Sequence, residues 1–191
     1  MPRSQSHPIE RSGTDVDWTD AQRLVVKRAH DVAVRAHQDQ TDKARRSYIG
    51  HPSRVAAYLA TSHGPQPAAA PEVIAAGWLH DVVEDTPTTL DDLARMGIPP
   101  SVLAIVDAVT KRADESPSEY AVRIAAHPGA VLVKRADLHD NTDGRRMALL
   151  DQTTRARLTF KYRQFSRLLD QAVAAQDSED QPLLSDAASR S

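Results

Sequence analysis

Apolar residues recur with a helical period along most of this sequence, and this pattern restricts the fold more than any other feature. Between residues 18 and 175 they return every three or four positions, as on one face of an α-helix. No alternating run typical of a β-strand competes with this pattern. Aromatic residues make up only 4% of the chain, and the apolar content is mostly Ala, Val and Leu. This composition favours closely packed helices, so we expect an all-α fold.

Proline, glycine and capping residues divide the pattern into about eight helices. Thr19 and Gln22 have the spacing of a capping box, and the first helix should end near His37. The third helix should run without interruption from near Pro71 to about Asp85. Other expected helix starts are marked by Pro52, by Thr88 with Asp91, and by Ser116 with Glu119.

The length of 191 residues suits about one domain with flanking tails. Residues 1–17 and 176–191 are rich in Ser, Asp, Gln and Arg, so we expect disordered tails around a single domain at residues 18–175. The N-terminal residues lack the apolar core of a signal peptide, and no apolar stretch is long enough to span a bilayer. We therefore expect a cytoplasmic protein that does not associate with membranes.

The absence of cysteine and the balanced charge exclude several classes of function. Without cysteine, the chain has no disulfide framework, no thiolate nucleophile and no zinc site built on Cys ligands. Metal binding would have to use histidines and carboxylates. The formal net charge of −2 lacks the basic excess that binding to a phosphate backbone usually needs, so nucleic acid is not an expected partner.

The segment from Trp78 to Asp85 carries the strongest chemical signal. Its two ionisable pairs, His80-Asp81 and Glu84-Asp85, lie one helical turn apart in an otherwise apolar run, so all four side chains could face one pocket. An imidazole and a carboxylate suit a divalent ion such as Mn²⁺ or Fe²⁺, and the second pair could orient or deprotonate a water. The competing interpretation, a solvated helix end, is disfavoured by the apolar run that precedes the motif.

Two residues cannot complete the coordination of a divalent ion, so further ligands must come from elsewhere in the chain. His51, at the start of the second helix, and Asp137, which follows the apolar stretch from Val131, are the candidates. Taken singly, a histidine before proline is more often a capping or surface residue. A lone helical aspartate is more often an ion-pair partner.

The order His51, then His80-Asp81, then Asp137 across one helical domain resembles the HD phosphohydrolase superfamily. With Glu84-Asp85 added, the segment from about His37 to Arg146 is similar to the hydrolase domain of RelA/SpoT-type alarmone enzymes and to the small alarmone hydrolases. The resemblance implies a single HD-superfamily helical domain. It also implies a metal-dependent phosphohydrolase that removes the 3′-pyrophosphate of a (p)ppGpp-like nucleotide.

The resemblance further implies a role for individual residues. One metal ion, normally Mn²⁺ in that family with Fe²⁺, Co²⁺ or Mg²⁺ as other divalent candidates, would be bound by His51, His80, Asp81 and Asp137. The catalytic carboxylates would be Glu84 and Asp85. The phosphorylated nucleotide, a small-molecule partner, would contact Lys43, Lys134 and Asn141.

Two positions depart from the family pattern. Asp42 stands where the family has an arginine that stacks on the purine, and Asp143 stands where alarmone enzymes often have another arginine. We expect both aspartates to face the mouth of the site and to weaken alarmone binding. Nearby guanidinium groups that could substitute belong to Arg45, Arg46, Arg145 and Arg146.

Two alternative functions therefore stay open. One is a phosphomonoesterase that acts on another nucleotide or on an NADPH-like dinucleotide. The other is a nucleotide-binding HD module without catalysis, which the Glu84-Asp85 pair argues against because a pure binder needs no water-activating carboxylate. The sequence gives no indication of the oligomeric state.

Overall fold

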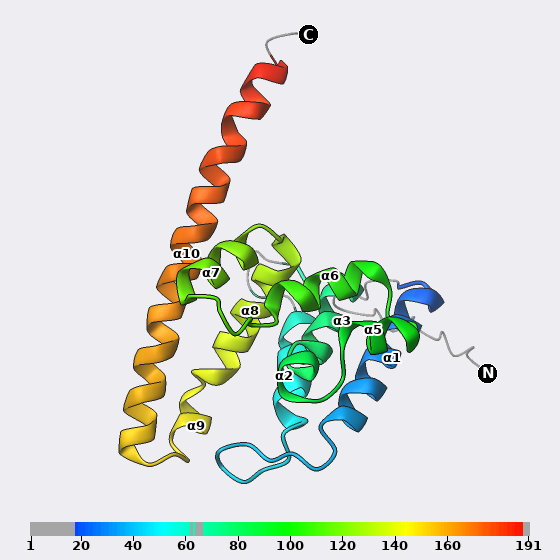
Figure 1. Cartoon of the computed structure of the whole chain (residues 1–191), viewed down its shortest axis with the longest axis vertical. Coiled ribbons are helices and arrows are strands. Elements are labelled where there is room, and N and C mark those ends of the chain that lie inside the picture. Colours follow the sequence, from blue (N-terminus) through cyan, green and yellow to red (C-terminus); the bar gives the residue numbers. More distant parts are fainter. Residues whose placement is uncertain (1–17, 62, 64–66, 189–191) are drawn as a thin grey trace, which may run out of the picture.

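The computed structural model of the chain describes residues 18–61, 63 and 67–188, and residues 179–188 by their backbone alone. This part of the chain forms ten helices and no strand, which confirms the expected all-α fold (Figure 1). In chain order the helices are α1 (Asp20–Ala36), α2 (Gly50–Leu59), α3 (Pro71–Leu79), α4 (Val82–Asp85), α5 (Leu90–Arg95), α6 (Pro100–Val109), α7 (Pro117–Ala125), α8 (Pro128–Asn141), α9 (Gly144–Met147) and α10 (Gln152–Ala188).

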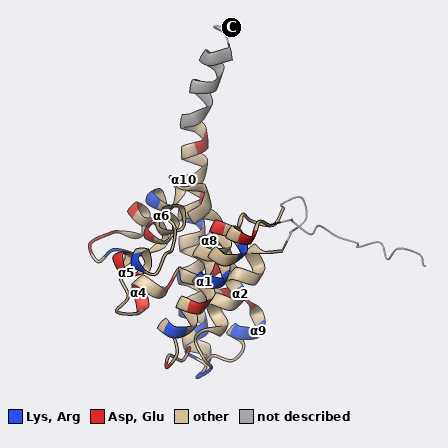
Figure 2. Ribbon diagram, turned by 90° about the vertical axis from the view of Figure 1, so that its right-hand side faces the viewer, with Lys and Arg blue, Asp and Glu red and all other residues tan. Residues whose placement is uncertain are grey.

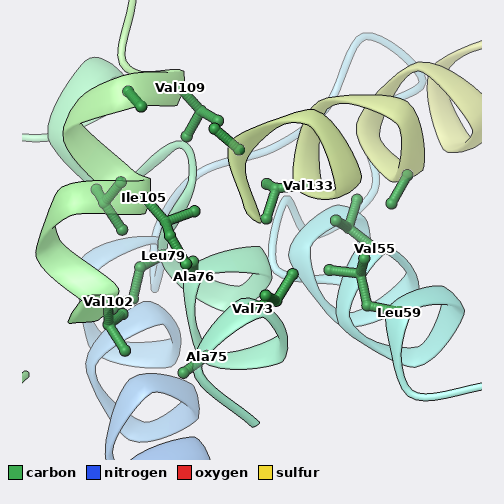
Figure 3. Close-up of a cluster of buried hydrophobic side chains, with 14 of the residues drawn as sticks. Val55, Leu59, Val73, Ala75, Ala76, Leu79, Val102, Ile105, Val109 and Val133 are labelled. Carbon is green, nitrogen blue, oxygen red and sulfur yellow. The ribbon is translucent and has the colours of Figure 1, made fainter. Parts of the chain in front are cut away.

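Helix α3 lies at the centre of the domain and is covered on every side. It packs against α1, α2, α6 and α8 (Figure 3). A helix that is apolar all round has to be buried all round, because no face of it can remain in water without cost. The α3 residues buried in this core are Pro71, Val73, Ile74, Ala75, Ala76, Gly77 and Leu79. The C-terminal end of α3, which leads into His80, is therefore held in the interior beside α2 and α8.

A glycine lets α2 approach α3 closely. A Cβ atom at Gly77 would lie 2.6 Å from Cδ1 of Leu59 and 3.6 Å from Cα of Ala56, both on α2. Because α2 begins with Gly50 and His51, this close packing sets how near His51 comes to the end of α3.

The capping boxes expected at Thr19-Gln22 and Ser116-Glu119 are both present. The cap expected at Thr88 is wrong by one residue, because Thr89 caps α5 and pairs with Asp92. The amide of Thr88 donates instead to the Thr86 hydroxyl at 3.2 Å, so Thr88 belongs to the preceding turn.

The helix expected from Pro71 to about Asp85 is interrupted in the structure. It ends at Leu79, a turn of two residues follows, and the short α4 then carries Glu84 and Asp85. Nδ1 of His80 donates to the Gly77 carbonyl at 2.8 Å, which satisfies one of the orphan carbonyls of the last turn of α3. Asp81 has φ −100° and ψ −6°, outside the centre of the helical region. The two ionisable pairs therefore do not share one continuous helix.

The last helix is longer than expected. Apolar contacts with the domain reach Val173, and α10 continues as a helix to Ala188, through most of the segment expected to be a disordered tail. Residues 174–178 contain neither glycine nor proline, and the Ser178 hydroxyl donates to the Ala174 carbonyl at 2.8 Å. The tail expected at residues 1–17 lies outside the described residues. None of the described helices has the length and apolar character needed to cross a membrane.

We predict that Leu79→Ala lowers the free energy of unfolding by ~2–5 kcal/mol, the usual cost of a large-to-small change in a packed core. Leu79 is 0% exposed at the end of the central helix. Urea unfolding followed by circular dichroism would measure the loss. The control is Leu24→Ala on α1, where the side chain is 52% exposed, and it should change stability by less than ~0.5 kcal/mol. Similar values for the two variants would contradict the central position of α3.

Candidate metal centre

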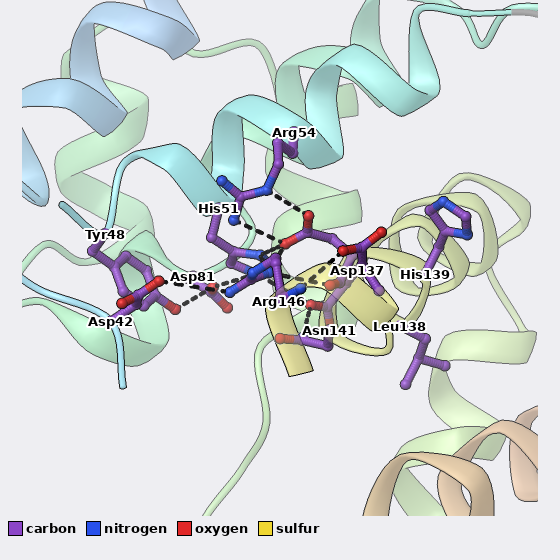
Figure 4. Close-up of polar contacts among 12 residues, drawn as sticks. Asp42, Tyr48, His51, Arg54, Asp81, Asp137, Leu138, His139, Asn141 and Arg146 are labelled. Carbon is purple, nitrogen blue, oxygen red and sulfur yellow. Dashed lines mark hydrogen bonds and ion pairs between the residues drawn. The ribbon is translucent and has the colours of Figure 1, made fainter. Parts of the chain in front are cut away.

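Three separate helical segments bring imidazole and carboxylate groups to one buried point. His51 comes from α2, His80 from the end of α3 and Asp137 from α8, and each offers a ligand atom within 4.8 Å of the other two (Figure 4). Oδ2 of Asp81 lies 3.4 Å from Nε2 of His51 and 3.1 Å from Nε2 of His80. The structure thus brings together the four side chains that the sequence analysis assigned to metal binding.

Hydrogen bonds on the outer side of each imidazole leave the inner nitrogen free. Nδ1 of His51 donates to Oδ2 of Asp140 at 2.6 Å, and Nδ1 of His80 donates to the Gly77 carbonyl. A neutral imidazole has a single N–H, so both Nε2 atoms then carry lone pairs. These two nitrogens are 3.2 Å apart, and Oδ1 of Asp137 lies 3.2 Å from Nε2 of His51. Lone pairs that converge in this way need a cation, or added protons on the rings, between them.

The electrostatics of the centre also favour positive charge. Burial disfavours protonation of His51, yet Asp137 and Asp81 outweigh burial and raise the pKa of this imidazole. The pKa of His80 is raised against its burial too, chiefly by Asp81. Burial also opposes ionisation of Asp81, but the neighbouring His80 holds the pKa of its carboxyl well below the usual range. Two imidazole nitrogens and two carboxylate oxygens form a donor set that fits a divalent transition-metal ion.

Lys134 and Asn141, expected to contact the substrate, both hold Asp137. Nζ of Lys134 lies 2.8 Å from Oδ2 of Asp137, and the amide of Asn141 donates to Oδ1 of the same carboxylate. Burial disfavours the charged form of Lys134, but the charge of Asp137 outweighs burial and raises the pKa of this lysine. Both side chains also line the cavity above the centre, so they are placed to contact a ligand as well.

The two expected catalytic carboxylates lie at the edge of the centre, on α4. Oε2 of Glu84 accepts the backbone N–H of Lys111 at 3.0 Å. Oδ2 of Asp85 lies 3.0 Å from the hydroxyl of Tyr48, and the same hydroxyl lies 2.6 Å from Oδ2 of Asp81. Burial and these two carboxylates raise the pKa of Tyr48, which keeps it a hydrogen-bond donor. Its one hydroxyl hydrogen serves one of the two carboxylates at a time, so Tyr48 connects Asp81 with Asp85.

A cavity of about 420 Å³ opens above the buried donors. Every residue assigned to the site from sequence lines it except His80, which lies beneath. Lys43 and Lys161 also line this cavity, and burial together with the charges of Lys161 and Arg157 lowers the pKa of Lys43. A second cavity of about 570 Å³ adjoins the first and shares Glu84, Lys134, Lys161 and Tyr162 with it.

Charged side chains of both signs line the cavity above the centre. Figure 2 shows Lys and Arg residues interspersed with Asp and Glu residues over the ribbon, in keeping with the net charge of −2. The 420 Å³ cavity is lined by five cationic side chains, Lys43, Arg46, Lys134, Arg146 and Lys161, and by five acidic ones, Asp42, Asp81, Glu84, Asp85 and Asp137. The basic side chains could contact an anionic ligand beside the carboxylates of the centre.

The aspartates that replace the expected arginines stabilise local backbone structure. Oδ1 of Asp42 accepts the backbone N–H groups of Ala44 and Arg46, at 2.8 and 2.9 Å. Asp143 is the N-cap of α9 and accepts the N–H groups of Arg145 and Arg146, each at 3.0 Å. Asp42 does line the cavity, but Asp143 does not, so the expectation that both carboxylates face the mouth is wrong for Asp143.

The four arginines that could replace the missing family arginines differ in their position relative to the cavity. Arg46 and Arg146 line the cavity, whereas Arg45 and Arg145 do not. Nη2 of Arg146 lies 3.9 Å from Oδ2 of Asp42. Two of the four arginines therefore lie at the site: Arg46 in the loop before α2, and Arg146 on α9, next to the helix cap that Asp143 forms.

Sequence reasoning missed two residues that contact the proposed ligands directly. Asp140 bonds His51, and Tyr48 bonds Asp81. The available signal for Asp140 was its position one helical turn after Asp137. His139, which lies two residues after Asp137, points away from the centre and packs against Tyr58, with the ring centroids 4.3 Å apart (Figure 4).

Comparisons with known proteins agree with this geometry. The chain is 35% identical over 146 residues to a GTP pyrophosphokinase of Streptomyces coelicolor, which covers 71% of this chain and 16% of that protein. It is 37% identical over 86 residues to the bifunctional (p)ppGpp synthase/hydrolase SpoT of Escherichia coli, which covers 45% of this chain and 11% of that protein. The chain therefore spans less than a fifth of the length of these relatives.

A solved structure has the same fold. It is described as a metazoan ortholog of SpoT that hydrolyzes ppGpp, and it superposes with a TM-score of 0.60 at 22% sequence identity. The match covers 82% of this chain and 87% of that chain. The family model described as HD domain matches residues 29–150, a range that holds all four converging side chains, and this chain therefore belongs to the HD-domain family.

Proposed function

We propose that this protein is a metal-dependent phosphohydrolase that removes the 3′-pyrophosphate of a (p)ppGpp-like nucleotide. One observation carries the proposal: the lone pairs of His51 and His80 converge with carboxylate oxygens at the floor of a cavity whose lining includes five Lys and Arg side chains. The relative named as a bifunctional (p)ppGpp synthase/hydrolase supports the choice of substrate.

One divalent ion would be held by His51, His80, Asp81 and Asp137, and our candidate is Mn²⁺. The mixed nitrogen and oxygen donor set suits Mn²⁺ or Fe²⁺ better than Mg²⁺, which prefers oxygen ligands alone. When bound, such an ion supplies charge neutralisation at the phosphoryl group and lowers the pKa of a water molecule.

The carboxylates of α4 would handle the proton of the attacking water. Attack by water at phosphorus breaks the bond to the 3′ oxygen, releases pyrophosphate and leaves a 3′-hydroxyl group. Glu84 would accept the water proton, because Oε2 is fixed by the amide of Lys111 while Oε1 has no partner among the described residues. Asp85, held by the hydroxyl of Tyr48, would orient the same water.

The cavity residues would bind the rest of the nucleotide. Lys43, Lys134 and Asn141 would contact phosphate or sugar oxygens, and Arg146 would add a guanidinium group at the mouth. Met147, Leu150 and Leu158 form an apolar part of the lining, which suits the face of a base.

Product analysis tests this function and separates it from its alternatives. Protein loaded with Mn²⁺ would be incubated with ppGpp, and the products resolved by anion-exchange chromatography. We expect GDP and pyrophosphate in equal amounts. Inorganic phosphate released from other nucleotides, with ppGpp left intact, would indicate a phosphomonoesterase. Binding of ppGpp without any product would indicate a module that only binds.

We predict that Asp81→Ala weakens Mn²⁺ binding by more than ~100-fold, because losing a ligand should cost at least as much as losing an outer-shell partner. Manganese electron paramagnetic resonance would measure free and bound ion. Asp85→Ala is the matched control, since it removes the neighbouring acid that also contacts Tyr48 but is not a proposed ligand. Equal manganese binding by the two variants would rule out Asp81 as a ligand.

We predict that Glu84→Gln lowers kcat for ppGpp hydrolysis by ~10²-fold or more, the usual scale for loss of a general base. Manganese affinity should not change, because Glu84 lies outside the ligand set. Asp91→Asn, which removes an exposed acid on α5, serves as the control and should keep full turnover. Near-normal kcat in Glu84→Gln would show that another residue is the general base.

We predict that Lys43→Ala raises KM for ppGpp by ~10-fold with little change in kcat, the effect of removing one charge-assisted hydrogen bond of ~1.5 kcal/mol. The matched control is Arg145→Ala, because Arg145 is a nearby cation that does not line the cavity. Steady-state kinetics would compare the two variants. An unchanged KM in Lys43→Ala would show that this lysine does not bind ppGpp.

A further inference from the structure

Asp140 is a buried carboxylate that lies behind the candidate metal centre. Its side chain is 7% exposed, and Oδ2 accepts the Nδ1 hydrogen of His51 at 2.6 Å. Oδ1 accepts from Nε of Arg54 at 2.6 Å, and Arg146 also donates to this carboxylate. Asp140 therefore contacts the ring of His51 on the side opposite the nitrogen that faces the centre.

We propose that Asp140 is a positioning residue that fixes the tautomer and orientation of His51, so that the Nε2 lone pair faces the point where His80 and Asp137 converge. The effect on metal affinity rests on the proposed function, whereas the effect on the ring itself does not.

The arrangement of helices supports this role. His51 and Arg54 lie one turn apart on α2, and Asp137 and Asp140 lie one turn apart on α8. The two packed helices thus each supply a proposed ligand and, one turn later, a member of the supporting network. Any change in how α2 packs on α8 would therefore move the proposed ligands and the residues behind them together.

The charges around Asp140 explain why His51 depends on it. Nη1 of Arg146 lies 3.5 Å from Nδ1 of His51, and the guanidinium of Arg54 is bound to the same carboxylate. Without Asp140, Nδ1 would face hydrogen-bond donors and would be favoured as an acceptor. The single proton of the neutral ring would then move to Nε2, where it blocks a metal.

His80 does not have this dependence on a side chain. Its Nδ1 donates to the backbone carbonyl of Gly77, which no substitution removes. The two imidazoles of the centre are thus held by different means. A change at Asp140 should alter His51 and leave the tautomer of His80 as it is.

The test uses Asp140→Ala, with Asp140→Asn as a milder second variant that keeps the side-chain volume. Long-range ¹⁵N–¹H correlation spectra of the full chain at alkaline pH would report the tautomer of each ring without metal. We expect the Nδ1–H form of His51 in the wild type and the Nε2–H form in Asp140→Ala. Manganese affinity, measured by electron paramagnetic resonance, should fall by ~10–100-fold in Asp140→Ala and by less in Asp140→Asn.

The matched control is Glu115→Gln, which breaks another largely buried ion pair, with Arg123, away from the centre. It should lower thermal stability but change neither the His51 tautomer nor manganese affinity. An unchanged His51 tautomer in both Asp140 variants would overturn the proposal. If the tautomer changes while the wild type binds no manganese, the positioning role holds and the metal proposal fails. Manganese binding within about threefold of wild type in Asp140→Ala would overturn the link to affinity.

Discussion

The burial of α3 on every side is the constraint on which the rest of the structure depends. Because α3 offers no polar face, α1, α2, α6 and α8 must all pack against it. This packing brings the start of α2, the end of α3 and the middle of α8 to one place. His51, His80 and Asp137 therefore meet inside the domain, far apart in sequence but within 4.8 Å of one another at their ligand atoms. The hydrophobic effect thus assembles a polar centre.

The buried carboxylates Asp137 and Asp140 are each balanced by a basic side chain. Asp137 is paired with Lys134, and Asp140 is paired with Arg54 and Arg146, so both carboxylates can stay ionised although they are almost fully buried. The inner face, where two imidazole nitrogens meet carboxylate oxygens, has no such cation from the described part of the chain. A divalent ion at that point would neutralise the carboxylate charge there, as Lys134, Arg54 and Arg146 do elsewhere.

The sequence predicted the helical class, two capping boxes and the four converging side chains. Each of these follows from local spacing or from the resemblance to the HD superfamily. It did not predict the break after Leu79, where the His80 ring donates to the Gly77 carbonyl and the backbone turns at Asp81. The expectation that Asp143 faces the mouth of the site was wrong, because an aspartate that caps a helix and one that faces a ligand look alike in sequence. The role of Asp140 emerged only with the packing of α2 on α8, which no single helix encodes.

Anomalous diffraction from a crystal soaked in Mn²⁺ tests the central claim most directly, because it locates the ion without any assumption about activity. We expect one strong peak at the manganese edge, with ligand distances of ~2.0–2.3 Å to His51, His80, Asp81 and Asp137, the range for nitrogen and oxygen ligands of divalent ions. A peak at another place, or an ordered centre with no anomalous signal at saturating Mn²⁺, would contradict the account.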